Sequence, residues 1–272
     1  MIKDILYSLP LVTRDTTDYA ISVASALEAH ITGLAFVYGP IIPTPGYIDP
    51  QFIELQMRES ESAARNASLR FDDAAARSGV SADVVKLNVE PGEAGRQFGR
   101  LARCFDLAVV GQAEPDGGMA EQVIVESSLF ETGRPTLIVP YIQKAPLKLD
   151  NVMVCWDGSR SASRAIADAL PFLKRAGRIE IAIVLGDPVK QDRVEGADMG
   201  QHLARHGLDI TVTQFPAGEI DVGNALLSHA ADIDADFMVM GGYGHSRLRE
   251  FVFGGVTRSF LNSMTAPVLM SH

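Results

Sequence analysis

Short apolar runs and longer segments of helical period alternate along this sequence, and the whole alternation occurs twice. Apolar runs bounded by turn residues predict strands, so their alternation with helical segments favours βα units around a largely parallel sheet. In the first half the expected strands lie near Ile5–Leu9, Ile31–Val37, Asp83–Leu87, Leu107–Val110 and Thr136–Val139, with helices near Thr16–Glu28, Gln51–Ser78, Ala94–Cys104 and Val123–Glu131. In the second half the strands lie near Asn151–Cys155, Arg178–Val184, Asp209–Gln214, Phe237–Met240 and Val268–Met270, with helices near Ala162–Lys174, Ala197–His206, Val222–Asp232 and Gly255–Ser263. The pattern predicts an α/β chain made of two doubly wound parts.

Two pairs of matching segments indicate that the halves are copies of one unit. Asp106–Gly111 matches Asp236–Gly241, since each has an acidic residue, a buried strand and a glycine. Pro135 and Pro267 each introduce an apolar strand, at a position where the missing N–H costs the strand ladder nothing. A short proline-containing linker separates the copies. The expected domains are residues 1–140 and 151–272.

The charge and cysteine content restrict the partners and the compartment. A net charge of −10 and an isoelectric point near 5.1 oppose binding to nucleic acids or anionic membranes, because like charges repel. Cys104 and Cys155 have no paired spacing, which indicates free thiols in a reducing compartment. The first apolar run is soon broken by Arg14 and Asp15, so we expect no signal peptide and place the chain in the cytoplasm.

The clearest chemical signal lies in residues 237–257, which run from a buried strand through a glycine-rich turn to a helix start. Gly241 and Gly244 can adopt positive φ and let a ligand approach, while Gly254 and Gly255 leave backbone N–H groups accessible to phosphate. Ligands of open parallel sheets bind beyond the carboxyl ends of strands, where strand order reverses. Asp157, at the end of the first strand of this half, is suited to accept hydrogen bonds from a ribose hydroxyl or an adenine amine.

With these residues, the second half resembles a nucleotide-binding domain of the universal stress protein family. The family motif is glycine, two residues, glycine, nine residues, glycine and then Ser or Thr, and Gly241, Gly244 and Gly254 have this spacing. Gly255 stands where the hydroxyl residue is expected, and Thr257 offers a hydroxyl in the same helical turn. The candidate cofactor-binding residues are Cys155, Trp156, Asp157, Val184, Met240, Gly241, Gly244, His245, Gly254, Gly255, Val256 and Thr257. For Trp156 and His245, packing and solvent exposure stay open as alternatives to ligand contact.

The resemblance implies two Rossmann-like, HUP-type domains, each with five parallel strands in the order 3-2-1-4-5. It also implies ATP, with or without Mg²⁺, as the cofactor, a stress-linked binding and signalling role, and pairing of two chains as a homodimer. The first copy departs from the motif. Glu114 replaces the second glycine, and the helices align Val12 with Asp157, so we expect no nucleotide in that half.

Other functions stay open at this point. A weak ATPase or nucleotide transferase would use Asp157 or Thr257, whereas Gly255 and the degraded first copy favour a scaffold that binds no nucleotide. A dinucleotide-dependent oxidoreductase is disfavoured because G-x-G-x-x-G does not follow the strand that ends at Cys155. No familiar catalytic motif is present, so we assign no catalytic residue.

Two further patterns indicate surface features. His202 and His206 share one helix face, but Leu203 replaces the glutamate of a zinc-protease motif, so we interpret them as solvent-facing and assign no metal site. Three alternating aspartates in 232–236 lack the glycine and glutamate of a calcium loop, and a helix-to-strand turn explains them.

Overall fold

The computed structural model describes residues 1–11, 16–41, 49–90, 92–113, 119–185, 196–242 and 260–272. Within these ranges the chain forms two compact α/β units. One comprises Met1–Arg134 with Lys144–Leu147, and the other comprises Pro135–Gln143 with Lys148–His272. Every helix in the described ranges is too short or too polar to cross a membrane.

The sheet of the second unit has the predicted doubly wound topology. Its strands are β6 (Asn151–Cys155), β7 (Arg178–Leu185), β8 (Ile210–Pro216), β9 (Phe237–Gly241) and β10 (Val268–Ser271). They pair in parallel in the spatial order β8-β7-β6-β9-β10, which is 3-2-1-4-5 in chain order. A sixth strand, β5 (Thr136–Val139), pairs antiparallel with β10. The sequence pattern groups β5 with the first half, but the structure packs it in the second unit.

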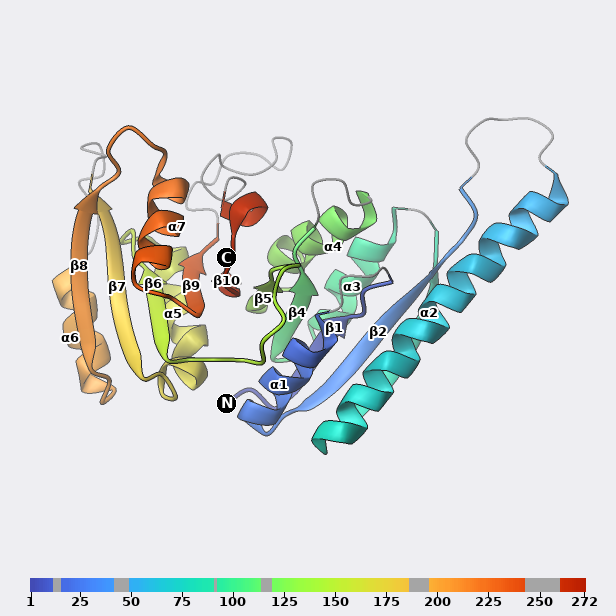
Figure 1. Ribbon diagram of the computed structural model, residues 1–272, viewed down its shortest axis with the longest axis horizontal. Helices are drawn as coiled ribbons and strands as arrows, with labels where there is room; N and C mark the ends of the chain where they lie inside the picture. Colours follow the sequence, from blue (N-terminus) through green and yellow to red (C-terminus); the bar gives the residue numbers. More distant parts are fainter. Residues whose placement is uncertain (12–15, 42–48, 91, 114–118, 186–195, 243–259) are drawn as a thin grey trace. The chain divides into compact units, whose positions relative to one another are not determined.

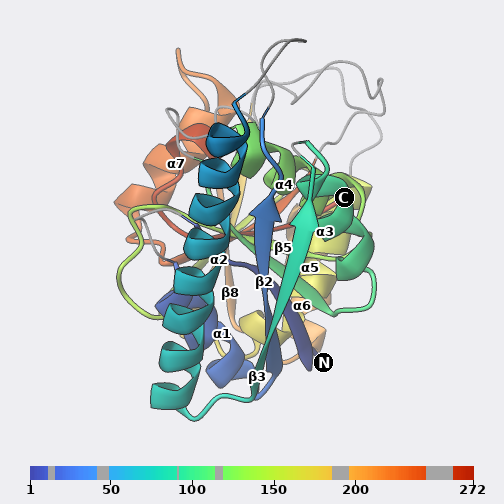
Figure 2. The same ribbon diagram turned by 90° about the vertical axis from the view of Figure 1, so that its right-hand side faces the viewer.

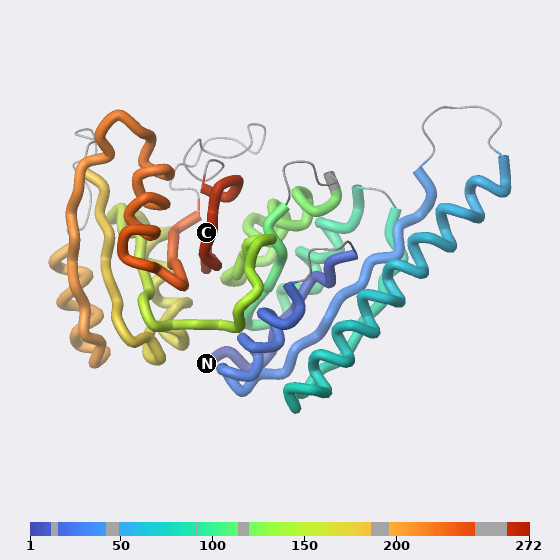
Figure 3. The backbone as a smooth tube through the Cα atoms, viewed as in Figure 1, coloured from blue at the N-terminus to red at the C-terminus, as the bar shows by residue number. Residues whose placement is uncertain are grey.

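Helices cover both faces of this sheet. They are α5 (Arg160–Leu173), α6 (Gly196–Arg205) and α7 (Val222–Asp232). Figure 1 shows α7 in front of the strands and α5 and α6 behind them, and Figure 3 traces the same path as a tube. The ring of Phe172 on α5 stacks on that of Phe237 at 5.0 Å between centroids, which anchors α5 over β9.

The first unit repeats this plan. Its strands β1 (Asp4–Ser8), β2 (His30–Tyr38), β3 (Ala82–Val89) and β4 (Leu107–Gly111) pair in parallel in the order β3-β2-β1-β4. Its helices are α1 (Thr17–Leu27), α2 (Pro50–Ser78), α3 (Ala94–Ala102) and α4 (Met119–Phe130). Figure 2 shows the long helix α2 running alongside β2 and β3. Asp49 accepts a hydrogen bond at the start of α2, and Gly79 ends the helix with a φ of 63°.

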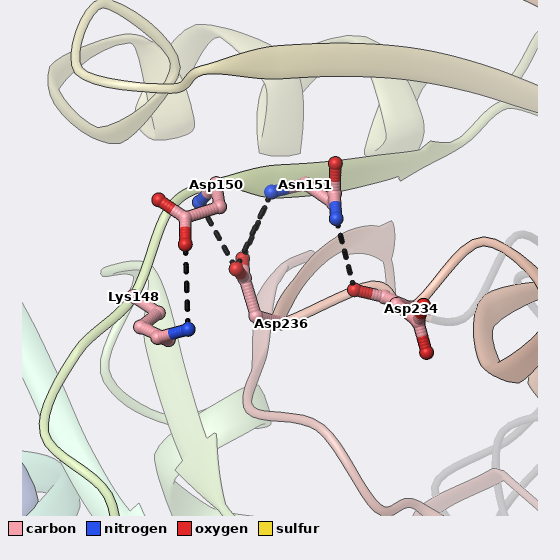
Figure 4. Close-up of polar contacts among 5 residues, drawn as sticks. All are labelled: Lys148, Asp150, Asn151, Asp234 and Asp236. Atoms are coloured by element: carbon pink, nitrogen blue, oxygen red, sulfur yellow. Dashed lines mark hydrogen bonds and ion pairs between the residues drawn. The ribbon is translucent and has the colours of Figure 1, made fainter.

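An aspartate at an equivalent position links the same two strands in each unit by accepting backbone hydrogen bonds. In the second unit, Asp236 accepts hydrogen bonds from the backbone N–H groups of Asp150 and Asn151 at 3.0 and 3.3 Å (Figure 4). In the first unit, Asp106 accepts them from Lys3 and Asp4 at 2.8 and 3.2 Å. The repeated arrangement explains why an acidic residue precedes this strand in both copies.

All the predicted strands are present, with ends that differ by at most two residues. The predicted helix Val123–Glu131 begins earlier, at Met119. Of the last predicted helix, Gly255–Ser263, only residues 260–263 are described, and they are helical. The expected domain limits, 1–140 and 151–272, stay predictions.

Candidate functional site

The carboxyl ends of β6 and β9 lie side by side in the second unit, and they hold most of the candidate residues that the structure describes. Cys155 is in register with Met240 on β9 and with Ala182 on β7. The next residue, Trp156, donates its backbone N–H to the carbonyl of Ala182 at 3.0 Å, so the pairing continues one residue past β6. Asp157 follows, half-buried, at the edge of the sheet where strand order reverses.

The turn after β6 is organised by hydrogen bonds to side chains. Asp157 accepts one from the Ser159 N–H at 3.0 Å, and Gly158 between them has a φ of 73°, which favours glycine. Ser159 is the N-cap of α5, because its hydroxyl accepts a hydrogen bond from the Ala162 N–H at 3.2 Å. The turn therefore fixes Asp157 directly beside the start of α5, where the helix dipole favours negative charge.

Gly241 is required for packing. A Cβ atom at this position would lie 2.4 Å from the backbone nitrogen of Ala162, so only glycine lets the first turn of α5 approach β9 so closely. Gly241 does not have positive φ, which corrects the expectation that its left-handed freedom opens the backbone to a ligand. The glycine is therefore explained without a ligand.

The residue after Gly241 is held by β10. The N–H of Gly242 donates to the carbonyl of Ser271 at 2.8 Å, and Nδ1 of His272 lies 3.3 Å from the Gly242 carbonyl. The Ser271 hydroxyl in turn donates to Asp168 on α5 at 2.8 Å. These contacts position the start of the glycine-rich turn relative to β10 and α5.

The thiol of Cys155 is unsuited to nucleophilic chemistry. Burial, and to a lesser extent the negative charge of Asp157, raise its pKa to about 12. The thiol is therefore protonated at neutral pH. Trp156 is also buried, which fits a packing role for its ring.

Of the remaining candidate cofactor-binding residues, Val184 lies within the described residues and the others do not. Val184 lies near the carboxyl end of β7, two residues beyond the last pairing between β7 and β6, and it is half-buried. Six candidates lie outside the described residues: Gly244, His245, Gly254, Gly255, Val256 and Thr257.

The first unit has different side chains at the equivalent positions. The backbone N–H of Leu9 donates to Leu34 as that of Trp156 donates to Ala182, so Pro10 is the equivalent of Asp157. The alignment of Val12 with Asp157 is therefore replaced by one that uses strand pairing, and Val12 itself lies outside the described residues.

The same register places two larger side chains at this edge of the first unit. The pairing of β2 with β1 places the buried Phe36 where the second unit has Val184. Gln112, also buried, follows Gly111 where Gly242 follows Gly241. Neither of these side chains carries the carboxylate that Asp157 brings to the second unit.

Two residues that shape the site were missed by the sequence analysis. Ser159 carries a signal that points to it, because a serine just before an apolar helical pattern is a typical N-cap. Asp168 carries no such signal, since its bond to Ser271 joins residues 103 apart in the sequence.

Comparison with known proteins gives consistent similarities. Residues 148–272 match the model of the universal stress protein family. A curated relative, Universal stress protein Slr1230 of Synechocystis sp. (strain ATCC 27184 / PCC 6803 / Kazusa), is 26% identical over 174 residues, which cover 61% of this chain. The match spans 57% of that relative's length.

Solved structures resemble the chain over nearly its full length. A universal stress protein from Archaeoglobus fulgidus DSM 4304 has a TM-score of 0.74 at 17% identity, covering 98% of this chain and 97% of its own. A functionally unknown protein from Pseudomonas aeruginosa PAO1 has a TM-score of 0.62 at 12% identity, covering 99% and 92%. At these identities the likeness shows a shared fold.

Proposed function

We propose that the second unit, whose residues 148–272 match the universal stress protein family model, binds an adenine nucleotide, ATP, with or without Mg²⁺. The observation that supports this proposal most directly is the place of Asp157. It follows β6, whose two neighbours are β7 and β9, at the point where strand order reverses. Doubly wound sheets bind nucleotides at this point.

In the proposed site the ribose, the adenine and the phosphates each contact a different part of the second unit. The Asp157 carboxylate accepts hydrogen bonds from the ribose, because it stands at the sheet edge and is already oriented by the Ser159 N–H. Val184, half-buried on the neighbouring strand, contacts the adenine. The phosphates are proposed to bind the backbone of the glycine-rich segment that begins after Gly242.

We propose that the first unit binds no nucleotide. Pro10 offers no carboxylate where the second unit has Asp157, and the large Phe36 ring takes the place of Val184. The protein would then hold one nucleotide per chain. Its proposed role is that of a binding and signalling module whose contacts with partners, including a second copy, change with nucleotide occupancy.

Calorimetric titration of the full chain with ATP, ADP and AMP tests this function. We expect one ATP site per chain, and we expect Asp157→Asn to weaken binding by about tenfold to a hundredfold, since it removes a charged acceptor. Asp209→Asn is the matched control, because Asp209 is exposed beside the amino end of β8, at the opposite edge of the sheet.

The titration and two further measurements, of nucleotide released on denaturation and of phosphate released on incubation with ATP, separate the rival functions. No heat with any nucleotide, together with no nucleotide released from the purified, denatured protein, would favour the scaffold. Magnesium-dependent phosphate release that disappears in Asp157→Asn and survives in Asp209→Asn would favour the enzyme.

A further inference from the structure

The carboxyl end of α6 carries two histidines that the proposed nucleotide site does not use. His202 lies in the last turn of α6, and His206 follows the helix directly. Since α6 leads from β7 back to the amino end of β8, this helix end lies at the sheet edge opposite the candidate nucleotide site. Any role of these histidines is therefore separate from nucleotide binding.

The two imidazole rings lie close together and are available to solvent. Their centroids are 4.9 Å apart, with an angle of 68° between the ring planes, and both residues are exposed. Among the described residues neither ring takes part in a hydrogen bond or ion pair. The sequence predicts a solvent-facing pair, and the structure adds that the two rings touch.

The backbone that carries these rings is held in one conformation. Gly207 ends the helix with a φ of 79°, and its N–H donates to the Ala204 carbonyl at 2.9 Å. The N–H of Leu208 donates to the carbonyl of Leu203, whose side chain is fully buried beneath the helix. A fixed helix end lowers the entropy cost of holding two side chains on one ligand.

The location also favours a cation. The partial negative charge at the carboxyl end of a helix attracts positive charge, and the chain as a whole carries −10. The exposed Arg205 opposes this attraction, so we expect moderate affinity. Two histidines at i and i+4 on one helix face form a recognised arrangement for binding zinc.

We propose that His202 and His206 together chelate one divalent transition-metal ion of the zinc and copper class through their imidazole nitrogens. Imidazole ligands suit these metals, whereas Mg²⁺ and Ca²⁺ prefer oxygen. Within the described ranges, no group of three histidine, cysteine or acidic side chains is placed to hold a metal. In the proposed site water completes the coordination, so the ion stays accessible to a ligand from another molecule.

Zinc titration of the full-length protein, without nucleotide, tests the proposal. We expect one equivalent of Zn²⁺ to bind, and we expect His202→Ala and His206→Ala each to weaken binding by about 100-fold, because the second imidazole acts at high effective concentration. Gln201→Ala, an exposed change on the same helix, is the matched control and leaves binding unchanged. Cu²⁺ is expected to bind more tightly than Zn²⁺.

Two results would overturn the proposal: no zinc binding by the unaltered protein, or zinc binding that both alanine variants retain. Circular dichroism of the variants checks that their fold is intact, which is expected because both positions are exposed. Nucleotide binding is measured separately, so failure here leaves the proposed function standing, and the reverse also holds.

Discussion

At the scale of single residues, the two copies differ at the first position of the first strand. Asp4 and Asn151 are equivalent, since each accepts a backbone hydrogen bond from the aspartate that fastens the strands, Asp106 or Asp236. The Asn151 side chain also donates to the Asp234 carbonyl at 3.3 Å. Asp4 has no such side-chain donor. Its carboxylate oxygen Oδ1 is buried without a hydrogen-bond partner in the described part of the chain.

We therefore predict that Asp4→Asn stabilises the protein. The amide would donate a hydrogen bond as Asn151 does and would remove a buried, unpaired carboxylate oxygen, which is worth about 1 kcal/mol in the free energy of unfolding. Urea denaturation measures the change, with Asp72→Asn on the exposed face of α2 as the control. A loss of stability in Asp4→Asn would show that Asp4 has a partner that the structure does not reveal.

Asp236 predicts a pH dependence of stability. Burial raises the pKa of this carboxyl above its usual value, although the N–H groups of Asn151 and Asp150 act in the opposite direction. Since the pKa is higher in the folded protein, the carboxyl contributes stability that is fully present below the unfolded pKa. That contribution is lost as the pH rises through the folded pKa.

The free energy of unfolding, measured between pH 3 and 7, checks this direction relative to Asp236→Asn. The unaltered protein should lose stability relative to the variant as the pH rises through this window, and the difference should then level off. A difference that grows in favour of the unaltered protein would mean that the hydrogen bonds outweigh burial and that the folded pKa is lowered.

At the scale of elements, a partly buried pair links β7, β8 and α7. Nε2 of His229 on α7 is hydrogen-bonded to Glu180 on β7. The centroid of the His229 ring lies 4.3 Å from that of the Phe215 ring on β8. The side chains of His229 and Glu180 are only 18% and 20% exposed, so removing one partner leaves the other poorly solvated. The pair therefore contributes to holding α7 on the sheet.

We predict that His229→Ala lowers the free energy of unfolding by about 1–3 kcal/mol, because Glu180 loses its buried partner. The double change with Glu180→Ala should cost less than the sum of the single changes, which a double-mutant cycle measures. His206→Ala, an exposed histidine of the same unit, is the control and should have little effect. Additive costs would show that the two side chains act independently.

The elements themselves were predictable, whereas several contacts between them were not. Alternating apolar and turn residues located strands such as Leu107–Gly111 to within a residue, because burial dictates their composition. The role predicted for Gly241 was wrong, because a glycine is needed there for the close approach of the Ala162 backbone, some eighty residues earlier in the sequence. Six residues of the candidate site lie outside the described ranges, so their roles stay predictions.

At the scale of the whole molecule, the strand pattern alone does not place β5. The pattern of Thr136–Val139 predicts a buried strand but does not say which sheet edge it occupies. In the structure it lies antiparallel to β10, with Ile138 opposite Val268 and Thr136 opposite Met270. The edge of β10 that would otherwise be exposed is thereby covered by a strand of the same chain.

This arrangement predicts how fragments of the second unit associate. A fragment of residues 148–272 lacks β5, so β10 becomes an open edge, and two copies can pair their β10 strands antiparallel about a twofold axis. A fragment of residues 135–272 retains β5, which covers this edge of β10, so its β10 strands should not pair with those of a second copy. Light scattering after gel filtration gives the masses, and circular dichroism confirms that both fragments fold. A folded, monomeric 148–272 fragment at high concentration would show that β5 is dispensable as a cover, whereas a dimeric 135–272 fragment would place the dimer contact on a surface other than β10.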